Sequence, residues 1–338
     1  MSYYLAIDAG GTSTRCLLAD SDTILARATT GSVKLMRVPE SEATARLHAM
    51  LDEVSITAGV PLSQITRTCI GLAGLSIPAV HAWATLTLAA HVAGEVILCG
   101  DEEIALAAAF PSASGILVIA GTGSNVIGRA SDGSLHSAGG WGPILGDEGS
   151  GFWIGLEAIR AALRAHDRSH QPHDDIDHPD NSARLLAEIQ RAFNLNSLPE
   201  LIALGNHRGD ANRAAPDFAS LAPVVAHCAE HGNPIAVAIL NRAGEQLAAQ
   251  VALVARKISA HTEEVSHRDR VPHSSQSHRD EWDSAETISV AFTGSVLTHI
   301  DLVRTAMISS LAQTLPTSHI HPTAIDPLEG ALYRARHA

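Results

Sequence analysis

The first part of the chain alternates short apolar runs with turns and two longer helical patterns. Short apolar runs bounded by Gly, Asp and Ser predict strands. Apolar residues spaced three and four apart, as in Glu40–Ala58, predict helices. The predicted order is β-β-β-α-β-α-β-α, with elements at Tyr3–Asp8, Arg15–Ala19, Thr23–Ala28, Glu40–Ala58, Ile65–Leu72, Ala79–Val92, Glu95–Cys99 and Glu102–Phe110.

The opening pattern of strand, glycine turn, strand, turn and strand then recurs at Gly115–Ala120, Asn125–Ala130 and Ser134–Ala138. This repetition indicates a duplicated architecture rather than a short tandem repeat. Mostly helical patterns follow. They predict helices at Ser150–Ala165, Ser182–Phe193, Leu198–Leu204, Phe218–Glu230, Pro234–Ser259, Leu302–Gln313 and Pro327–Arg336, with one strand at Ile288–Phe292.

Two segments, His166–Asp180 and His261–Glu286, are polar and rich in His, Ser and Asp. Such segments bury too little apolar area to offset the entropy of ordering them. Their histidines lack a regular ligand spacing, so the sequence favours solvated surface loops over a His/Asp metal site.

Composition narrows the classes of function. The chain has 338 residues, with 23 Lys+Arg against 36 Asp+Glu and a net charge of −13. A surface this acidic disfavours binding to nucleic acid or anionic lipid through bulk charge. The start lacks a signal-peptide pattern, no apolar stretch is long enough to span a bilayer, and the four cysteines form no CxxC pair. We therefore expect a cytoplasmic protein with reduced thiols.

Two glycine turns each follow an apolar strand. The first, at Asp8–Thr12, contains Gly10 and Gly11 and is followed by Ser13; the second is Gly121–Asn125. Glycine lets backbone N–H groups approach a phosphate, and the hydroxyls of Thr12 and Ser13 add donors. A single turn of this kind is ambiguous, but two on duplicated units suggest that they grip one polyphosphate. Asp8 is suited to bind magnesium, through water.

Asp101 follows a predicted strand and precedes a predicted helix. A carboxylate at the carboxyl end of a strand is well placed to act as a general base. It could accept the proton of a substrate hydroxyl that attacks a γ-phosphate. Asp is also a good helix N-cap, and the two interpretations are compatible.

The stretch Gly139–Gly151, GGWGPILGDEGSG, is rich in glycine and contains Trp141 and Asp147. It is either a capping loop over a buried Trp141 or a substrate wall, in which Trp141 offers an apolar face and Asp147 accepts sugar hydroxyls; we favour the wall. A third glycine turn, Phe292–Val296, contains Gly294, which would let a flat adenine ring lie close to the backbone.

Together, DAGGT, GTGSN, GGWG…GDEGS, FTGSV and PLEGAL resemble the motifs of the sugar-kinase/Hsp70/actin ATPase superfamily. More narrowly, nearly the whole chain resembles the BadF/BadG/BcrA/BcrD ATPase family and its N-acetylglucosamine kinases. The resemblance implies two ribonuclease H-like α/β domains with mixed five-stranded sheets around a nucleotide cleft. It places the first domain at residues 1–114 plus the returning helix 327–338, and the second at 115–326, with a helical insertion at 149–259.

The resemblance also implies an ATP- and magnesium-dependent kinase of a small sugar, most simply an N-acetylated amino sugar. Asp101 would be the catalytic base and would also bind the sugar. The ATP and magnesium residues would be Asp8, Gly10, Gly11, Thr12, Ser13, Gly121, Thr122, Gly123, Gly294 and Ser295. The sugar pocket would be lined by Ser124, Asn125, Gly140, Trp141, Gly142 and Asp147, with Lys34 at its edge.

The chain departs from the family pattern after its third predicted strand. The family carries a sugar-binding Asn in a GxxN turn, whereas this turn reads Gly31-Ser32-Val33-Lys34. Lys donates hydrogen bonds and carries charge but accepts none. One hypothesis is a substrate that bears a carboxylate, such as an N-acetylmuramic-acid-like sugar; the other is that Lys34 points to solvent.

Two other functions remain open at this point. Some relatives are ATPase activators that hold an iron–sulfur cluster between subunits, which requires exposed thiolate ligands. A sugar sensor that binds ligand without turnover is the third possibility, although intact Asp101 and Asp147 argue against it. For any of these functions we expect a homodimer.

Overall fold

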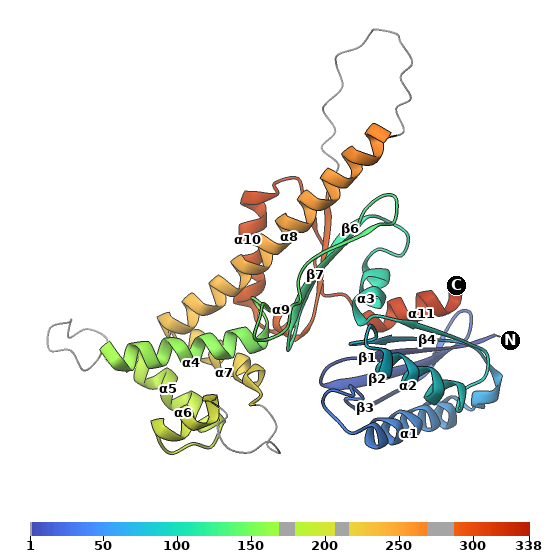
Figure 1. The fold of residues 1–338 in the computed structure, drawn as a ribbon, viewed down its shortest axis with the longest axis horizontal. Coiled ribbons are helices and arrows are strands. Elements are labelled where there is room, and N and C mark those ends of the chain that lie inside the picture. Colours follow the sequence, from blue (N-terminus) through green and yellow to red (C-terminus); the bar gives the residue numbers. More distant parts are fainter. Residues whose placement is uncertain (1, 169–179, 207–215, 269–286) are drawn as a thin grey trace, which may run out of the picture. The chain divides into compact units, whose positions relative to one another are not determined.

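The structure is a computed structural model that describes residues 2–168, 180–206, 216–268 and 287–338 (Figure 1). Its strands are β1 (Tyr3–Ala9), β2 (Ser13–Ala19), β3 (Ile24–Gly31), β4 (Ile65–Leu72), β5 (Glu95–Cys99), β6 (Gly115–Ala120), β7 (Ser124–Arg129), β8 (Leu135–Gly139), β9 (Ser289–Thr293) and β10 (His319–Ile320).

The α-helices are α1 (Glu40–Ala58), α2 (Pro78–Ala89), α3 (Asp101–Ala109), α4 (Gly151–Arg168), α5 (Asp180–Ala192), α6 (Leu198–Asn206), α7 (Ala222–Glu230), α8 (Pro234–Arg268), α9 (Ser295–His299), α10 (Asp301–Thr314) and α11 (Pro327–His337). Two short 3-10 helices lie at Leu62–Gln64 and Phe218–Leu221. The chain divides into two compact units: Met1–Leu117 with Ile127–Ser134 and Thr323–Ala338, and Val118–Val126 with Leu135–Pro322.

The first sheet has strand order β3-β2-β1-β4-β5. Strand β1 pairs antiparallel with β2 and parallel with β4, so the sheet is mixed. Successive side chains of β1 alternate between two cores, because a strand points neighbouring residues to opposite faces. Leu5 and Ile7 pack with residues of α1 and α2, while Ala6 packs with residues of α3 and α11.

The C-terminal helix α11 packs against α3 and the first sheet, although these elements lie far from it in sequence (Figure 1). Gly330 makes this packing close. A Cβ at Gly330 would lie 1.8 Å from the carbonyl oxygen of Ile104 on α3. The absence of a side chain at Gly330 therefore allows the two helix backbones to touch.

The second sheet has strand order β10-β9-β6-β7-β8. In reverse, this order matches the first sheet strand for strand, with β6, β7 and β8 in the places of β1, β2 and β3. The duplication predicted from the sequence is therefore confirmed. Helices α8 and α10 pack together in this part of the chain, and α4 packs against α5, α7 and α8.

Several predicted bounds differ from the structure. Helix α8 continues to Arg268, nine residues beyond the predicted end at Ser259, and α4 continues to Arg168. The predicted polar loops are therefore wrong at residues 166–168 and 261–268, where both helices continue. Helix α5 already begins at Asp180, while residues 169–179 and 269–286 lie outside the described residues. Strand β10 and the short helix α9 were not predicted.

Candidate functional site

The first glycine turn connects β1 to β2. Its carbonyl groups are fixed from outside the turn: Ser32 Oγ donates to the Gly10 oxygen at 3.3 Å, and an Arg37 guanidinium nitrogen donates to the Gly11 oxygen at 2.9 Å. Thr12 and Ser13 are exposed. The turn therefore has a fixed backbone and two hydroxyls that a ligand can reach.

Asp8 lies near the end of β1, beside this turn, with its side chain 15% exposed. Arg15 on β2 contacts Asp8 at 2.6 Å and Asp326, the residue before α11, at 2.8 Å. Burial raises the pKa of Asp8, and the hydrogen bond from Arg15 opposes that rise. No local pattern in the sequence predicts this bridge between Asp8, Arg15 and Asp326.

Asp8 fits a magnesium ion only in a restricted way. Residues 2–168, 180–206, 216–268 and 287–338 contain no cluster of three or more His, Cys, Asp or Glu side chains that could hold a metal. Magnesium commonly keeps several waters and binds through one or two carboxylates plus substrate phosphates. Asp8, with one oxygen already paired to Arg15, is suited to contact such an ion through water.

Asp101 is the first residue of α3, directly after Gly100, which occupies the N-cap position. Burial is the largest cause that raises the pKa of Asp101, to about 7; a hydrogen bond with Glu102 and the charges of Glu102 and Asp8 add to it. Asp8 and Asp101 therefore influence each other within the first unit. A carboxyl with a pKa near neutrality is suited to exchange a proton at physiological pH.

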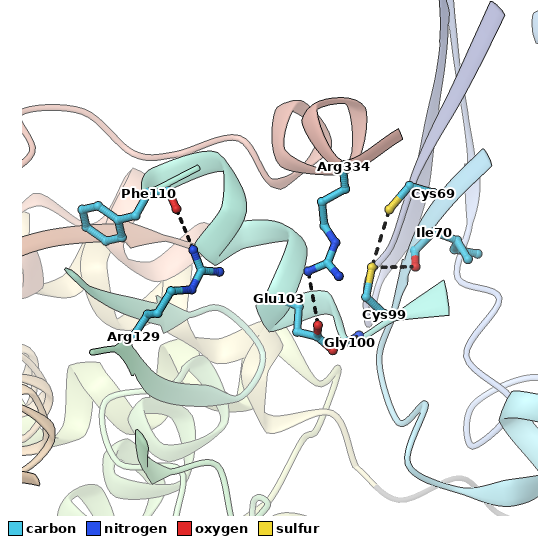
Figure 2. Close-up of polar contacts among 8 residues, drawn as sticks. All are labelled: Cys69, Ile70, Cys99, Gly100, Glu103, Phe110, Arg129 and Arg334. Carbon is cyan, nitrogen blue, oxygen red and sulfur yellow. Dashed lines mark hydrogen bonds and ion pairs between the residues drawn. The ribbon is translucent and has the colours of Figure 1, made fainter. Parts of the chain in front are cut away.

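The start of α3 is held from both sides (Figure 2). The Glu103 carboxylate accepts the Gly100 N–H at 3.1 Å and pairs with Arg334 of α11 at 3.3 Å. Beside it, the thiols of Cys69 on β4 and Cys99 on β5 lie 3.5 Å apart in the core. These contacts fix the backbone that carries Asp101.

The second glycine turn connects β6 to β7 and supports the start of α4. The Gly121 N–H donates to the Gly123 oxygen at 2.9 Å. The N–H groups of Gly151 and Phe152 donate to the carbonyls of Gly121 and Thr122 at 2.8 and 3.2 Å. The turn is thus tied to a helix terminus through its carbonyls.

Gly294 and Ser295 lie beside this second turn, although they are far away in sequence. Gly294 follows β9 with φ +96°. A Cβ at Gly294 would lie 2.3 Å from the Ala120 oxygen, and a Cβ at Gly121 would lie 3.7 Å from Ser295 Oγ. The structure therefore brings the predicted adenosine residues Gly294 and Ser295 to the predicted phosphate residue Gly121.

Of the residues predicted to bind sugar, Ser124, Asn125, Gly140, Trp141, Gly142 and the buried Asp147 lie in the second unit, whereas Lys34 and Asp101 lie in the first. Asp147 Oδ1 accepts the Gly142 N–H at 2.9 Å, and its Oδ2 lies 2.8 Å from the place of a Cβ on Gly123. Ser124 Oγ donates to the Glu148 carbonyl at 2.9 Å. Asn125 lies against Gly140, where a Cβ would be 3.0 Å from the amide carbon.

Trp141 is not buried beneath this loop, so the capping-loop alternative is wrong on that point. Its exposed fraction is 73%, and the nearby Ile144 and Leu145 are more exposed still. The loop therefore presents an apolar tip next to the polar cluster around Asp147.

Sequence reasoning missed Glu148 and Gln250. The Gln250 amide nitrogen on α8 donates to Glu148 Oε2 at 3.3 Å, and a Cβ at Gly139 would lie 2.5 Å from the Gln250 Oε1. The side-chain amide oxygens of Gln250 (Oε1) and Asn125 (Oδ1) are buried without a hydrogen-bond partner. A polar residue in a long amphipathic helix carries no signal of this contact, so only the structure reveals it.

Lys34 lies in the turn after β3. Its backbone N–H donates to Ser32 Oγ at 3.2 Å, and its carbonyl accepts the Arg37 N–H at 2.8 Å. Its side chain is half-buried, and within the described parts of the chain its ammonium group forms no ion pair. Because Ser32 also contacts Gly10, the Lys34 turn is joined to the first glycine turn.

Comparison with known proteins supplies the family. The model of the BadF/BadG/BcrA/BcrD ATPase family matches residues 5–333. An N-acetylmuramic acid/N-acetylglucosamine kinase of Clostridium acetobutylicum is 30% identical over 267 residues, which is 78% of this chain and 83% of the relative. An N-acetyl-D-glucosamine kinase of Dictyostelium discoideum is 24% identical over 97% of this chain and 96% of its own.

A solved structure from Chromobacterium violaceum, provisionally assigned as an N-acetylglucosamine kinase, aligns with TM-score 0.69 and 26% identity over 98% of both chains. A glucokinase of the ROK family from Streptomyces griseus shares the fold, with TM-score 0.54 and 14% identity over the whole of both chains. The resemblance inferred from the motifs is confirmed: this chain belongs to the BadF/BadG/BcrA/BcrD ATPase family.

Proposed function

We propose that this protein is an ATP-dependent kinase that phosphorylates a hydroxyl of an amino sugar. The observation that carries the proposal is Asp101, in a chain related to amino-sugar kinases over most of its length. Its carboxyl begins α3 in a fixed position and has a pKa near 7. A carboxylate whose pKa lies near the working pH is well suited to general-base catalysis on a sugar hydroxyl.

In the proposed reaction, Asp101 accepts the proton of the sugar hydroxyl while the hydroxyl oxygen attacks the γ-phosphorus of ATP. The bond from that phosphorus to the β,γ-bridging oxygen breaks, and ADP leaves. The protein forms no covalent bond to the phosphoryl group in this reaction. Its contribution to catalysis is therefore mostly to position the reactants and to stabilise charge in the transition state. A magnesium ion held near Asp8 through water would neutralise phosphate charge.

We assign the two glycine turns to the phosphates of ATP: Gly10, Gly11, Thr12 and Ser13 in the first unit, and Gly121, Thr122 and Gly123 in the second. Gly294 and Ser295, which lie beside Gly121, are assigned to adenosine. The fixed carbonyls of both turns support this assignment, because they preset the backbone before ligand binds.

We assign sugar binding to the cluster around Asp147, which comprises Ser124, Asn125, Gly140, Trp141, Gly142 and Asp147. The buried Asp147 carboxylate is an acceptor suited to sugar hydroxyls, and the exposed Trp141 ring offers an apolar face. Next to the same loop, the side chains of Glu148 and Gln250 are hydrogen-bonded to each other.

The test is a panel of sugars in an ADP-release assay with purified protein: N-acetylglucosamine, glucosamine, N-acetylmuramic acid and glucose, with a no-sugar control. We expect release that depends on sugar and is fastest with an amino sugar. Saturable sugar binding without ADP release would instead support a sugar sensor, and sugar-independent ATP hydrolysis would contradict the kinase proposal.

The ATPase-activator alternative has less support. It requires thiolates that can reach a shared iron–sulfur cluster. All four cysteines, Cys16, Cys69, Cys99 and Cys228, are buried. Burial also raises the pKa of Cys16, which keeps this thiol protonated.

The remaining parts of the proposal concern organisation. No helix in the described part of the chain is long and apolar enough to cross a bilayer. We propose a cytoplasmic homodimer that uses a sugar as its small-molecule partner. We also retain as a proposal the division into residues 1–114 with 327–338 and residues 115–326.

Lys34 provides a prediction about the sugar. Replacing Lys34 with Asn removes one cation beside the first glycine turn. We expect kcat/KM for N-acetylmuramic acid to fall about tenfold relative to that for N-acetylglucosamine, the effect of one charge-assisted contact. The measurement is the ratio of the two kcat/KM values in wild type and Lys34→Asn.

The matched control for Lys34 is Arg27→Gln, which removes a positive charge from an exposed position on the preceding strand β3. It should leave the ratio unchanged. An equal loss in both variants, or an unchanged ratio in Lys34→Asn, would show that Lys34 does not recognise a carboxylate.

The pKa of Asp101 gives a second prediction. The base works only when deprotonated, so kcat/KM should rise with pH and level off above about 7. Between pH 6 and pH 8 the rise should be about tenfold, from the deprotonated fraction of a single group. The measurement is a pH profile of sugar phosphorylation.

Glu102→Gln should move this profile to lower pH. It removes the neighbouring charge that raises the pKa of Asp101, and the Gln amide can donate to the ionised carboxylate. A profile that keeps its midpoint in Glu102→Gln would argue that another group controls the pH dependence.

A further inference from the structure

A groove lies in the second unit between α4 and the first turns of α8, with a volume of about 330 Å³. It is lined by Ala161 and Arg164 of α4 and by Pro234, Ile235, Ala238, Ile239 and Arg242 of α8. None of these residues belongs to the sites assigned to ATP or sugar above. Its volume lies at the small end of the range for ligand pockets.

The groove carries an excess of positive charge. Arg160, Arg164 and Arg242 all pair with the single carboxylate of Glu157 on α4. In the described residues, Glu157 is the only acidic side chain that pairs with them. Three guanidinium groups share one carboxylate, so about two positive charges remain uncompensated at this place.

The two arginines that line the groove are held differently. Arg242 stacks on the Trp153 ring at 4.9 Å and pairs closely with Glu157 Oε2, which fixes its planar head. Arg164 reaches the same oxygen only at 3.9 Å, and its side chain is 56% exposed. Most of its hydrogen-bond donors are therefore uncommitted, next to a guanidinium that is already fixed.

The rest of the groove is apolar. Ala161, Pro234, Ile235, Ala238 and Ile239 present methyl and methylene groups. The helix terminus adds no free donor there, because Asn233 Oδ1 accepts the N–H groups of Ile235 and Ala236 at 3.1 Å. Any affinity for an anion must therefore come from the arginines.

We propose that this groove binds a small organic carboxylate, with the carboxylate on Arg164 and Arg242 and the hydrocarbon part against α8. The planar fork of Arg matches a carboxylate and can bind it through two parallel hydrogen bonds. The Glu157 carboxylate, which also pairs with both arginines, is not among the residues that line the groove. The proposal does not depend on the kinase assignment.

The experiment is fluorine NMR of 4-fluorobenzoate titrated with the full-length protein, with excess ADP present to fill the proposed nucleotide site. We expect saturable binding in the millimolar range. Neutral 4-fluorobenzyl alcohol should bind far more weakly. Unlabelled acetate, which lacks the apolar part, should displace 4-fluorobenzoate only at much higher concentration.

Two variants locate the site. Arg164→Gln should weaken 4-fluorobenzoate binding about tenfold. Arg160→Gln removes the same charge from the same helix, but Arg160 does not line the groove and cannot contact the ligand there, so it should weaken binding clearly less than Arg164→Gln does. Ala238→Trp should fill the groove and abolish binding, with the fold checked by circular dichroism.

Three results would each overturn the proposal. The first is no binding of 4-fluorobenzoate to the wild-type protein. The second is equal weakening by Arg164→Gln and Arg160→Gln, which would show a general charge effect. The third is undiminished binding to a folded Ala238→Trp variant, which would place the ligand elsewhere.

Discussion

Asp101→Asn should abolish sugar phosphorylation while leaving ATP binding intact. The amide has nearly the same shape as the carboxyl but cannot accept the proton of the sugar hydroxyl. Loss of a general base costs about 10²- to 10⁴-fold in rate. We expect kcat in the ADP-release assay to fall by about that range, while calorimetry with ATP gives an affinity within about twofold of wild type.

Asp22→Asn is the matched control, since it makes the same chemical change at an exposed turn between β2 and β3. It should retain wild-type kcat. If Asp101→Asn also retained near-normal turnover, the proton acceptor would have to be another group. Loss of ATP affinity in Asp101→Asn would instead indicate that Asp101 shapes the nucleotide site.

The same substitution should stabilise the protein at alkaline pH. In the folded state the pKa of Asp101 is raised to about 7, above the ordinary value of 3.8 for an Asp side chain. The folded protein therefore binds more protons than the unfolded chain between these values, and its stability falls as pH rises through that window. Asp101→Asn removes this loss, so its Tm should exceed that of wild type by roughly 2–5 °C at pH 8 and by little at pH 4.

A gain in stability with loss of activity is informative, because it separates a catalytic role from a structural one. A carboxylate kept for capping or packing would cost stability when replaced. A carboxylate kept for catalysis in an unfavourable, half-buried position would release strain when neutralised. An unchanged or lower Tm at pH 8 would argue that Asp101 is ionised and well satisfied in the folded protein.

Much of the fold could be predicted because local signals and burial agree. The predicted bounds of α1, β4, β5 and β6 match the structure residue for residue. In each case an apolar run or helical repeat ends at residues that favour turns. The glycine turns at Gly10 and Gly121 were found in the same way, because a turn between two apolar strands leaves a local signature.

Other features depend on contacts that no local pattern reports. Helix α8 continues through His261–Arg268, where the apolar repeat fades, because polar residues with adequate helix propensity can extend an existing helix without a new nucleus. The Gln250–Glu148 contact and the Arg15 bridge join residues far apart in sequence. From the sequence alone, a polar side chain at any of these positions is equally compatible with exposure to solvent and with a buried contact.

The proximity of Gly294 to Gly121 is another contact between residues far apart in sequence, and a substitution at Gly294 should have a large effect. Gly294 has φ +96° and ψ 153°, a conformation almost restricted to glycine. A Cβ there would lie 2.3 Å from the Ala120 oxygen and 2.9 Å from the Gly121 nitrogen. The clash is with backbone of β6 and of the second glycine turn, which cannot move aside like a side chain.

Gly294→Ala should therefore displace either the start of α9 or the turn at Gly121. We expect a loss of about 2–4 kcal/mol in the free energy of unfolding, from the combined cost of backbone strain and overpacking. The affinity for ADP should fall at least about tenfold, because both the proposed adenosine residues and the proposed phosphate residue are disturbed. Thermal unfolding and calorimetry with ADP measure the two effects.

Gly232→Ala is the matched control, because it introduces the backbone strain of a positive φ without the steric clash expected at Gly294. Gly232, between α7 and α8, has φ +79°, but a Cβ there would meet no atom within 4 Å. This control should lose only about 1 kcal/mol and should bind ADP as wild type does. If Gly294→Ala unfolded like Gly232→Ala and kept its ADP affinity, the contact between Gly294 and the second turn would not support nucleotide binding, and the adenosine assignment would fall with it.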